Sequence, residues 1–412
     1  MEKEIKFVSS KKYEDKKLRE NMSNEGNIYR LFYFFYWAAA SSLIPYLGIY
    51  YKNLNLIGHQ IGLLGGIPYI FVFIWSIFFG FLADLTQKYR LLLKISILGL
   101  IVSVSLIFFA DSFQQLVPVI ALYAVFSSPI NPIVDKLTLD WASRCNGEYG
   151  KIRIGGSLGY GLVVTITGFI ITLFNLKWIF LVYVFFILIC YSTTFYFNNS
   201  TKQIVKEKVS IKDFIDSFKN VNFIIFLLLI ITWGMGESSV TNFLFLHMFD
   251  IGSNYILMGL SISFAIISES IVFLHIAKIN KRIGLINTLV VGFIIQIIRL
   301  LGLSYIRTPW MGILAQLFGG ASFGFIWAGG VAYVNKNLPK KLSTTAQGLR
   351  TGFQSGLGYA IGVIFSGYLY ENVGSALLYR YMSIIVLFGI ILFIFTNSFL
   401  GNHTGKRLHN SK

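Results

Sequence analysis

Long apolar stretches separated by short polar segments make up nearly the whole chain. A transmembrane helix needs about 20 predominantly apolar residues to cross the hydrocarbon core of a bilayer. Stretches of that length recur between Leu31 and Phe399, and they predict twelve membrane-spanning helices. The predicted spans are Leu31 to Tyr51, Ile61 to Ala83, Leu91 to Ala110, Leu116 to Leu139, Ile152 to Phe174, Trp178 to Phe197, Phe223 to Phe249, Ile256 to Ile279, Ile286 to Ile306, Trp310 to Val334, Thr351 to Tyr370 and Ala376 to Phe399.

A polar interval divides these spans into two sets of six. Residues 198–222 contain five lysines and are too polar to cross a membrane. We therefore predict an all-α membrane protein with two six-helix bundles, at residues 28–197 and 223–399. Residues 198–222 then form a linker, and residues 1–27 and 400–412 form two polar tails.

The distribution of basic residues predicts the orientation in the membrane. Short loops rich in Lys and Arg remain in the cytoplasm. If the N-terminus is cytoplasmic, the outer loops hold only four of the 35 basic residues, namely Lys52, Lys177, Arg307 and Arg380. We therefore expect both tails and the linker to be cytoplasmic, in a bacterial-type inner membrane.

The composition excludes several other classes of protein. The chain is 55% hydrophobic and 13% charged, with a mean hydropathy of +0.67, so no stretch is polar enough to form a soluble domain. The net charge of +17 falls in short patches between spans, which indicates topology signals and not a nucleic-acid surface. Two cysteines and the absence of nucleotide, metal or hydrolase motifs predict no enzymatic activity, no cofactor and no metal site. We expect a monomer in a lipid bilayer.

Five ionisable residues lie inside predicted spans, where each costs about 2.5 to 3.5 kcal/mol and is therefore a functional candidate. They are Asp135, Arg153, Glu237, Glu269 and Arg299. Asp135 and Arg153 lie at similar distances from the loop that joins spans four and five, so an ion pair between them is expected. In the alternative, both side chains extend to the headgroups and only anchor the hairpin.

Two helical faces combine charge with aromatic side chains. Arg153, Ser157 and Tyr160 follow at i, i+4 and i+7, so they share one face of span five, and such a face suits a hydroxylated solute. The alternative is ordinary helix packing through the neighbouring glycines. On span seven, Trp233 and Glu237 share a face that would suit an aqueous cavity.

Glu269 lies in the middle of span eight, where a carboxylate must be paired, hydrated or protonated. Arg299 lies at comparable depth on span nine and is its expected counter-ion, with Gln296 on the same face. This arrangement makes Glu269 a candidate for substrate binding and for proton coupling, with Glu237 and Arg299 as further coupling residues. A purely structural pair of Glu269 and Arg299 is the alternative.

One loop and one helix resemble a known family. The segment Gly80-Phe-Leu-Ala-Asp84-Leu-Thr-Gln-Lys88-Tyr-Arg90 resembles the signature loop of the major facilitator superfamily, whose conformational switch would then include Gly80, Asp84, Lys88 and Arg90. The segment from Tyr149 to Gly161 resembles span five of the lactose permease branch, which includes phenylpropionate and nucleoside proton symporters. The resemblance extends from about Ile28 to Phe399.

The resemblance implies site residues and also shows departures. It places Asp135 and Arg153 at the sugar, Tyr160 as a stacking aromatic, and Glu269 and Arg299 at the carboxylate and arginine of spans eight and nine. The lactose permease carries Lys, His and Glu on span ten, where this chain has Ala315, Phe318 and Ala321. A lysine on span eleven of the permease is replaced by Gln354, and the aspartates on its span seven are matched only by Glu237. Proton coupling would then fall to Glu269 or Glu237.

These observations favour a secondary transporter that takes up a small polar solute with protons. Sugars, nucleosides and small aromatic acids all suit arginines beside aromatic rings. An exporter of the same fold is the alternative, although span five lacks the proline of the glycine and proline motif typical of antiporters. A receptor or a channel could share the number of spans but would not explain paired charges inside both halves.

Overall fold

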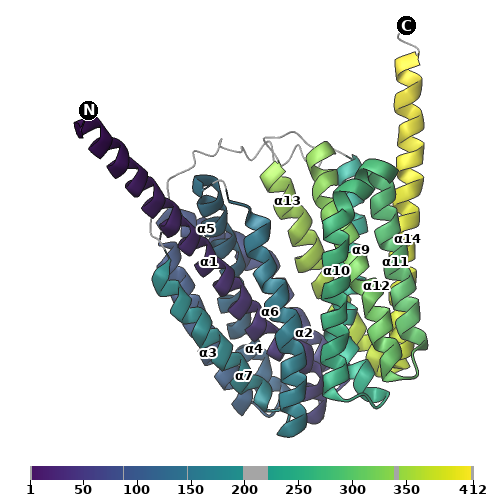
Figure 1. Cartoon of the computed structure of the whole chain (residues 1–412). Helices are drawn as coiled ribbons and strands as arrows, with labels where there is room; N and C mark the ends of the chain where they lie inside the picture. The colour runs from purple at the N-terminus through teal and green to yellow at the C-terminus, as the bar shows by residue number, and fades with distance from the viewer. Residues whose placement is uncertain (1, 87, 146, 198–220, 338–342, 410–412) are drawn as a thin grey trace.

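The computed structural model describes residues 2–86, 88–145, 147–197, 221–337 and 343–409, and all regular structure in this part of the chain is helical. Two bundles of long helices lie side by side (Figure 1). The first bundle comprises α1 (Glu2–Asn53), α2 (Gly58–Thr86), α3 (Tyr89–Phe109), α4 (Phe113–Ser127), α5 (Ile130–Cys145), α6 (Tyr149–Leu173), α7 (Trp178–Thr193) and η1 (Thr194–Tyr196). The second comprises α9 (Val221–Asp250), α10 (Tyr255–Ile283), α11 (Leu285–Tyr305), α12 (Pro309–Asn337), α13 (Ser343–Thr351), the π-helix η3 (Gly352–Gly358) and α14 (Tyr359–His409).

The helices confirm the predicted twelve crossings. Within the described residues, eleven helices are long and apolar enough to span a membrane, and the last of them runs from Ala346 to Thr396. Gly374 divides that helix, because its φ of 80° and ψ of 168° interrupt the helical backbone. Glycine adopts such a positive φ at little cost, since it has no Cβ. The two limbs on either side of Gly374 are the eleventh and twelfth spans.

Some boundaries differ from the prediction. The fourth span consists of two helices, α4 and α5, because Pro129 lies between them and has no N–H to continue the hydrogen-bond ladder. Helix α1 continues through the boundary predicted at residue 28 without a break. Most of the predicted linker, residues 198–220, lies outside the described residues.

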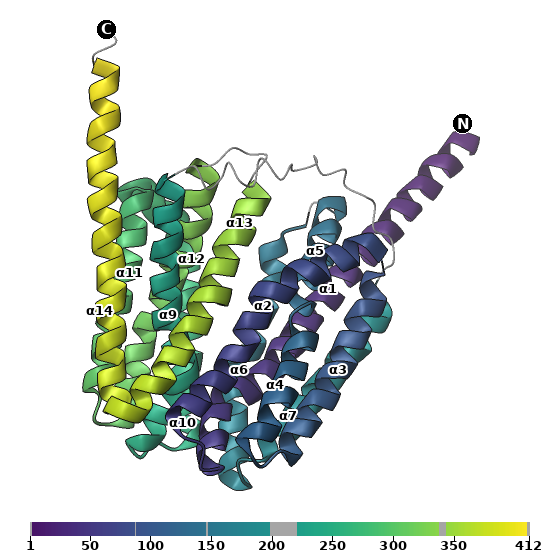
Figure 2. The same ribbon diagram turned by 180° about the vertical axis from the view of Figure 1, so that it is seen from behind.

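The two bundles meet at one end of the molecule. Figures 1 and 2 show the bundles separating toward the end from which α1 and α14 project, which we call the terminal end. At the opposite end, here called the closed end, the two bundles pack together through α6 on α10, α2 on α14 and α1 on α9. The structure is therefore closed between the bundles at one end only.

Glycines form much of the contact between bundles at the closed end. A Cβ on Gly62 would lie 2.8 Å from the Cα of Gly367, and a Cβ on Gly259 would lie 2.6 Å from the Cα of Thr165. A Cβ on Gly168 would overlap the carbonyl oxygen of Tyr255. Small residues are common where membrane helices approach this closely, because dispersion contacts and not hydrophobic burial hold such helices together.

Polar contacts join the bundles at the same end. Lys52 of α1 forms an ion pair with Asp250 of α9, and Tyr370 of α14 donates a hydrogen bond to the same carboxylate at 2.8 Å. His59 of α2 contacts Glu371 of α14, with Nδ1 and Oε2 separated by 2.7 Å. These groups are exposed or partly exposed to solvent, so each pair contributes little to stability. They align the bundles, while the glycine contacts determine how closely the helices approach.

We predict that Gly168→Val opens the closed end. The added side chain would overlap the backbone at Tyr255, so α6 and α10 must separate. A cysteine introduced at Thr165, in a background without Cys145 and Cys190, should then react faster with a polar maleimide. Gly302→Ala is the control, because a Cβ there meets no atom within 4 Å. Equal labelling rates in the two variants would contradict the prediction.

Candidate functional site

Aromatic rings surround the arginine of α6 in the first bundle. The guanidinium carbon of Arg153 lies 4.9 Å from the ring centroid of Trp37 and 5.2 Å from that of Tyr33. Cation–π attraction operates within about 6 Å of a ring centroid. Arg153 makes no hydrogen bond or ion pair with any described residue, so its N–H groups are available to a ligand.

The carboxylate of Asp135 lies next to the same rings. It accepts a hydrogen bond from Tyr149 at 2.9 Å and another from Tyr33. Asp135 and Arg153 therefore do not form the predicted ion pair. The reason is the position of Tyr33, whose hydroxyl binds the carboxylate while its ring faces the guanidinium. Tyr33 thus contacts both Asp135 and Arg153, and these two residues do not form an ion pair.

The rest of the predicted α6 stripe continues from this cluster. The ring of Tyr160 lies 6.1 Å from that of Trp37, and Ser157 is half-buried on the same helix face. Nε1 of Trp37 is buried and has no hydrogen-bond partner in the described residues. A buried donor without a partner costs about 1 to 3 kcal/mol, so this indole is suited to donate to a bound solute.

Glu269 of α10 lies in the second bundle, on the helix that packs against α6. Hydrogen bonds connect the two helices closer to the closed end, where Ser263 donates to the carbonyl of Gly161 and lies 2.8 Å from Oγ1 of Thr165. This antiparallel register places Glu269 near the level of Ser157. Arg153 attracts the Glu269 carboxylate and Glu237 repels it. The carboxylate makes no hydrogen bond or ion pair with the described residues.

Arg299 pairs with Glu237. The predicted pair of Arg299 and Glu269 does not form. Nη1 of Arg299 lies 2.6 Å from Oε2 of Glu237, and its Nη2 donates to Oε1 of Gln316 at 2.6 Å. Gln296 donates to the same Glu237 oxygen at 3.3 Å. The side chain of Arg299 is only 4% exposed, so the four residues form a buried network inside the second bundle.

Helix α12 is the physical reason for this different pairing. A Cβ on Gly319 would lie 2.5 Å from the guanidinium carbon of Arg299, whereas a Cβ on the adjacent Gly320 would lie 2.8 Å from the backbone nitrogen of Glu269. Successive residues on a helix point in different directions. The backbone of α12 therefore lies between Arg299 and Glu269 and separates them.

Trp233 is fully buried and does not line an open surface, contrary to the prediction. Its Nε1 donates to Ser322 at 3.4 Å, and its ring lies 5.8 Å from that of Phe323. In this conformation, Trp233 packs the interior of the second bundle.

The predicted switch loop is only partly described. Arg90 donates from Nε to the carbonyl of Thr194 at 2.9 Å and also contacts the carbonyl of Phe195. It therefore binds the backbone carbonyls at the C-terminal end of the sixth span. Such cation contacts satisfy the last carbonyls of a helix. Lys88 is exposed. Gly80 and Asp84 lie in α2, and the structure describes only their backbone.

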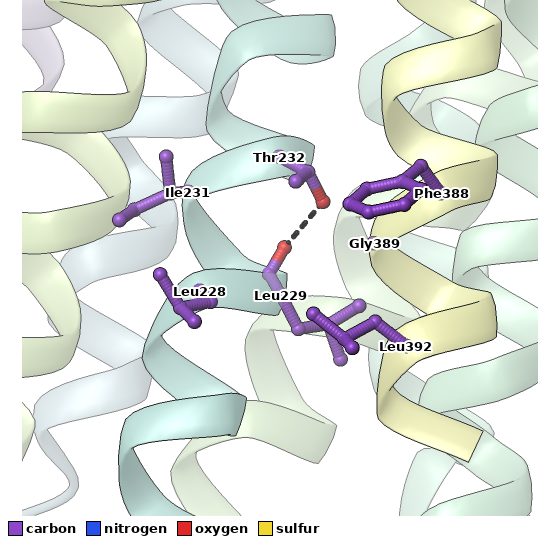
Figure 3. A pocket seen from close by; sticks show the side chains of 7 residues that line it. All are labelled: Leu228, Leu229, Ile231, Thr232, Phe388, Gly389 and Leu392. Carbon is purple, nitrogen blue, oxygen red and sulfur yellow. Dashed lines mark hydrogen bonds between the residues drawn. The ribbon is translucent and has the colours of Figure 1, made fainter. Parts of the chain in front are cut away.

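A hollow of about 200 Å³ lies elsewhere, between α9 and α14 (Figure 3). Its lining is apolar except for Thr232, whose hydroxyl donates to the carbonyl of Leu229 at 2.8 Å. Phe388 at its rim is 67% exposed on the outer surface of the bundle. This hollow offers no charge and no free polar group, so it does not suit a polar solute.

Several residues near these charges are neutral, so the positions of ionisable residues in the sequence do not indicate them. Tyr33 and Trp37 are spaced by four on span one and therefore share a face, but an aromatic pair in a span with many aromatics gives no signal by itself. Tyr149 precedes the predicted span, and Gln316 is one neutral amide in span ten. Aromatic residues spaced by four in a span, together with an arginine in another span of the same half, are the pattern that would indicate Tyr33 and Trp37.

Two bundles of six spans, closed at one end and carrying charges on the helices that face each other, define a transporter of the major facilitator type. Residues 27–381 match the model of the MFS_1 like family, and the chain belongs to this family.

Proteins similar to the chain agree with this assignment. The uncharacterized transporter YwbF of Bacillus subtilis is 27% identical over 88% of this chain and 92% of its own length. The maltose permease of Geobacillus stearothermophilus is 25% identical over 89% of this chain and 93% of its own length. Among solved structures, the nucleoside transporter NupG superposes with a TM-score of 0.79 at 19% identity, over 90% of this chain and 99% of that one.

We predict that the two acids of the second bundle differ in their effect on stability. Glu237→Gln leaves Arg299 buried without a counter-ion, which should destabilise the protein by about 3 to 5 kcal/mol. Glu269→Gln removes a carboxylate that has no partner and should leave the melting temperature unchanged or raise it. Thermal unfolding of the purified protein in detergent compares the two matched variants. An equal loss in both would contradict the assigned pairing.

Proposed function

We propose that the protein is a secondary transporter that takes up a small polar solute together with protons by alternating access. The observation that carries the proposal is the pair of unsatisfied opposite charges on facing helices, Arg153 in the first bundle and Glu269 in the second. Transporters of this kind bind substrate between their halves. A solute that contacts both residues would connect the two bundles.

The surroundings of Arg153 suggest the chemistry of the solute. The partly exposed rings of Trp37 and Tyr160 offer faces for stacking, while Ser157 and the N–H of Trp37 offer hydrogen bonds. Sugars, nucleosides and small aromatic acids all have such a combination of a flat face and polar groups. The names of two similar proteins, a maltose permease and a nucleoside transporter, fall in the first two classes.

The charge pattern supports the proposed orientation in the membrane, and one carboxylate supports the proposed coupling. With both tails cytoplasmic in an inner membrane, the closed end faces outward and the terminal end faces the cytoplasm. Glu269 is the proposed proton carrier, because a carboxylate that lacks a hydrogen-bond partner in low dielectric can take up a proton without breaking a contact. Glu237 is the reserve, although its carboxylate pairs with Arg299.

We predict that Arg153→Gln and Asp135→Asn each abolish solute binding while the protein still inserts and elutes as a single species. The first removes the donor. The second replaces the charged acceptor of the Tyr33 hydroxyl with a weaker neutral one, so the ring of Tyr33 beside Arg153 is held less firmly. Thermal-shift assays with maltose, uridine and benzoate identify the bound class in the parent protein and measure its loss in the variants. Tyr305→Phe, on the outer side of α11, is the control. Parental binding in either variant would make Asp135 and Arg153 boundary anchors.

We predict that Glu269→Gln loses uphill uptake but retains exchange. A neutral amide cannot carry a proton, yet it can still hydrogen-bond the solute. Proteoliposomes with an imposed proton gradient measure accumulation, and counterflow of labelled solute measures exchange. Accumulation by Glu269→Gln at the parental level would exclude this residue as carrier. If the parent ignores the gradient, the proposal of symport is wrong, and efflux against a proton gradient would indicate an exporter.

A further inference from the structure

Arg350 of α13 is a buried cation that pairs with no acidic residue in the described part of the chain. Its side chain is 2% exposed. Only four acidic residues occur between positions 221 and 399, namely Glu237, Asp250, Glu269 and Glu371. Three of them pair with Arg299, Lys52 and His59, and Glu269 lies on the helix facing Arg153. The bundle therefore holds a guanidinium for which it supplies no anion.

The side chains around Arg350 leave two donors unused. Its Nε donates to Oε1 of Gln347 at 3.0 Å, and its Nη1 donates to Oε1 of Gln354 at 2.7 Å, while its Nη2 makes no hydrogen bond with the described residues. Because Oε1 of Gln354 accepts from Arg350, its Nε2 must be a donor. That Nε2 is buried and has no partner. The amide of Gln354 therefore contacts the guanidinium through its oxygen, and its N–H₂ group finds no acceptor among the described residues.

The backbone and one ring hold this arrangement in place. Gln347, Arg350 and Gln354 share a helix face, and Gln354 lies in the π-helix η3. Single-turn π segments in helices are frequent at functional sites. The indole of Trp327 lies under the guanidinium, with the ring centroid 4.5 Å from its central carbon, and Phe323 stacks on Trp327 at 5.5 Å. The arginine is therefore held in one orientation beside an aromatic surface.

We propose that Arg350 and Gln354 form a carboxylate-binding site, separate from the solute site around Arg153 and Glu269. Two adjacent N–H donors match the two oxygens of a carboxylate, and charge-assisted bonds of this geometry are the stronger kind. The stack of Trp327 and Phe323 favours an organic acid with a flat apolar part over a small inorganic anion. Binding would supply the anion that the four acids of this bundle do not provide.

The experiment measures the melting temperature of the purified full-length protein with benzoate, benzamide, sodium phosphate or sodium chloride. Benzoate should raise it and benzamide should not, because only benzoate has the carboxylate. The test variant is Gln354→Glu, which places an internal carboxylate beside Arg350. It should melt higher than the parent without ligand and bind benzoate at least about 10-fold more weakly. Arg350→Lys should weaken binding as well, since an ammonium lacks the planar fork.

A matched control separates this site from the solute site. Arg153→Gln should keep the part of the benzoate response that depends on Gln354, and it should lose only a part contributed by an aromatic acid bound at the central site. Loss of the response in Arg153→Gln with its retention in Gln354→Glu would assign benzoate to the central site and overturn the proposal. An equal shift with benzamide, with phosphate or with chloride would overturn the carboxylate assignment, and so would the absence of any benzoate shift in the parent. None of these outcomes depends on whether transport is coupled to protons.

Discussion

A charge that leaves water for the interior of a membrane protein needs an opposite charge, a hydrogen-bond partner or a proton. This constraint organises the molecule. Glu237 and Arg299 satisfy it within one bundle, together with two amides, and the result is a fixed structural network. Asp135 satisfies it with two tyrosine hydroxyls. Arg153 and Glu269 do not satisfy it within their own bundles, and these two residues lie on helices that face each other.

The sequence predicts the fold well because the hydrophobic effect and backbone hydrogen bonding act on whole spans. Twenty apolar residues must form a helix in lipid, whatever their neighbours do. The break at Gly374 and the interruption at Pro129 also follow from local backbone chemistry. Spans, their order and the division into two bundles can therefore be obtained without any tertiary information.

The site is less predictable, because pairing depends on which helix lies between two others. Arg299 and Glu269 are at comparable depth on neighbouring spans, which made them natural partners. Two adjacent glycines on α12 show that this helix separates them, and no periodicity within spans eight and nine contains that information. The charge of Arg153 makes it a predicted binding residue, whereas the rings of Tyr33 and Trp37 beside it belong to span one and have no charge to mark them.

The glycine contacts at the closed end have a thermodynamic consequence. Where Gly62 meets Gly367 and Gly259 meets Thr165, the touching surfaces are largely backbone and small atoms. Separating these contacts exposes little apolar area to water. The hydrophobic cost of separation is roughly proportional to that area, so it is small here. Under the proposed alternating access, these contacts therefore add little to the cost of opening this end. A small ligand can more easily shift a balance of that kind with the modest binding energy that it has available.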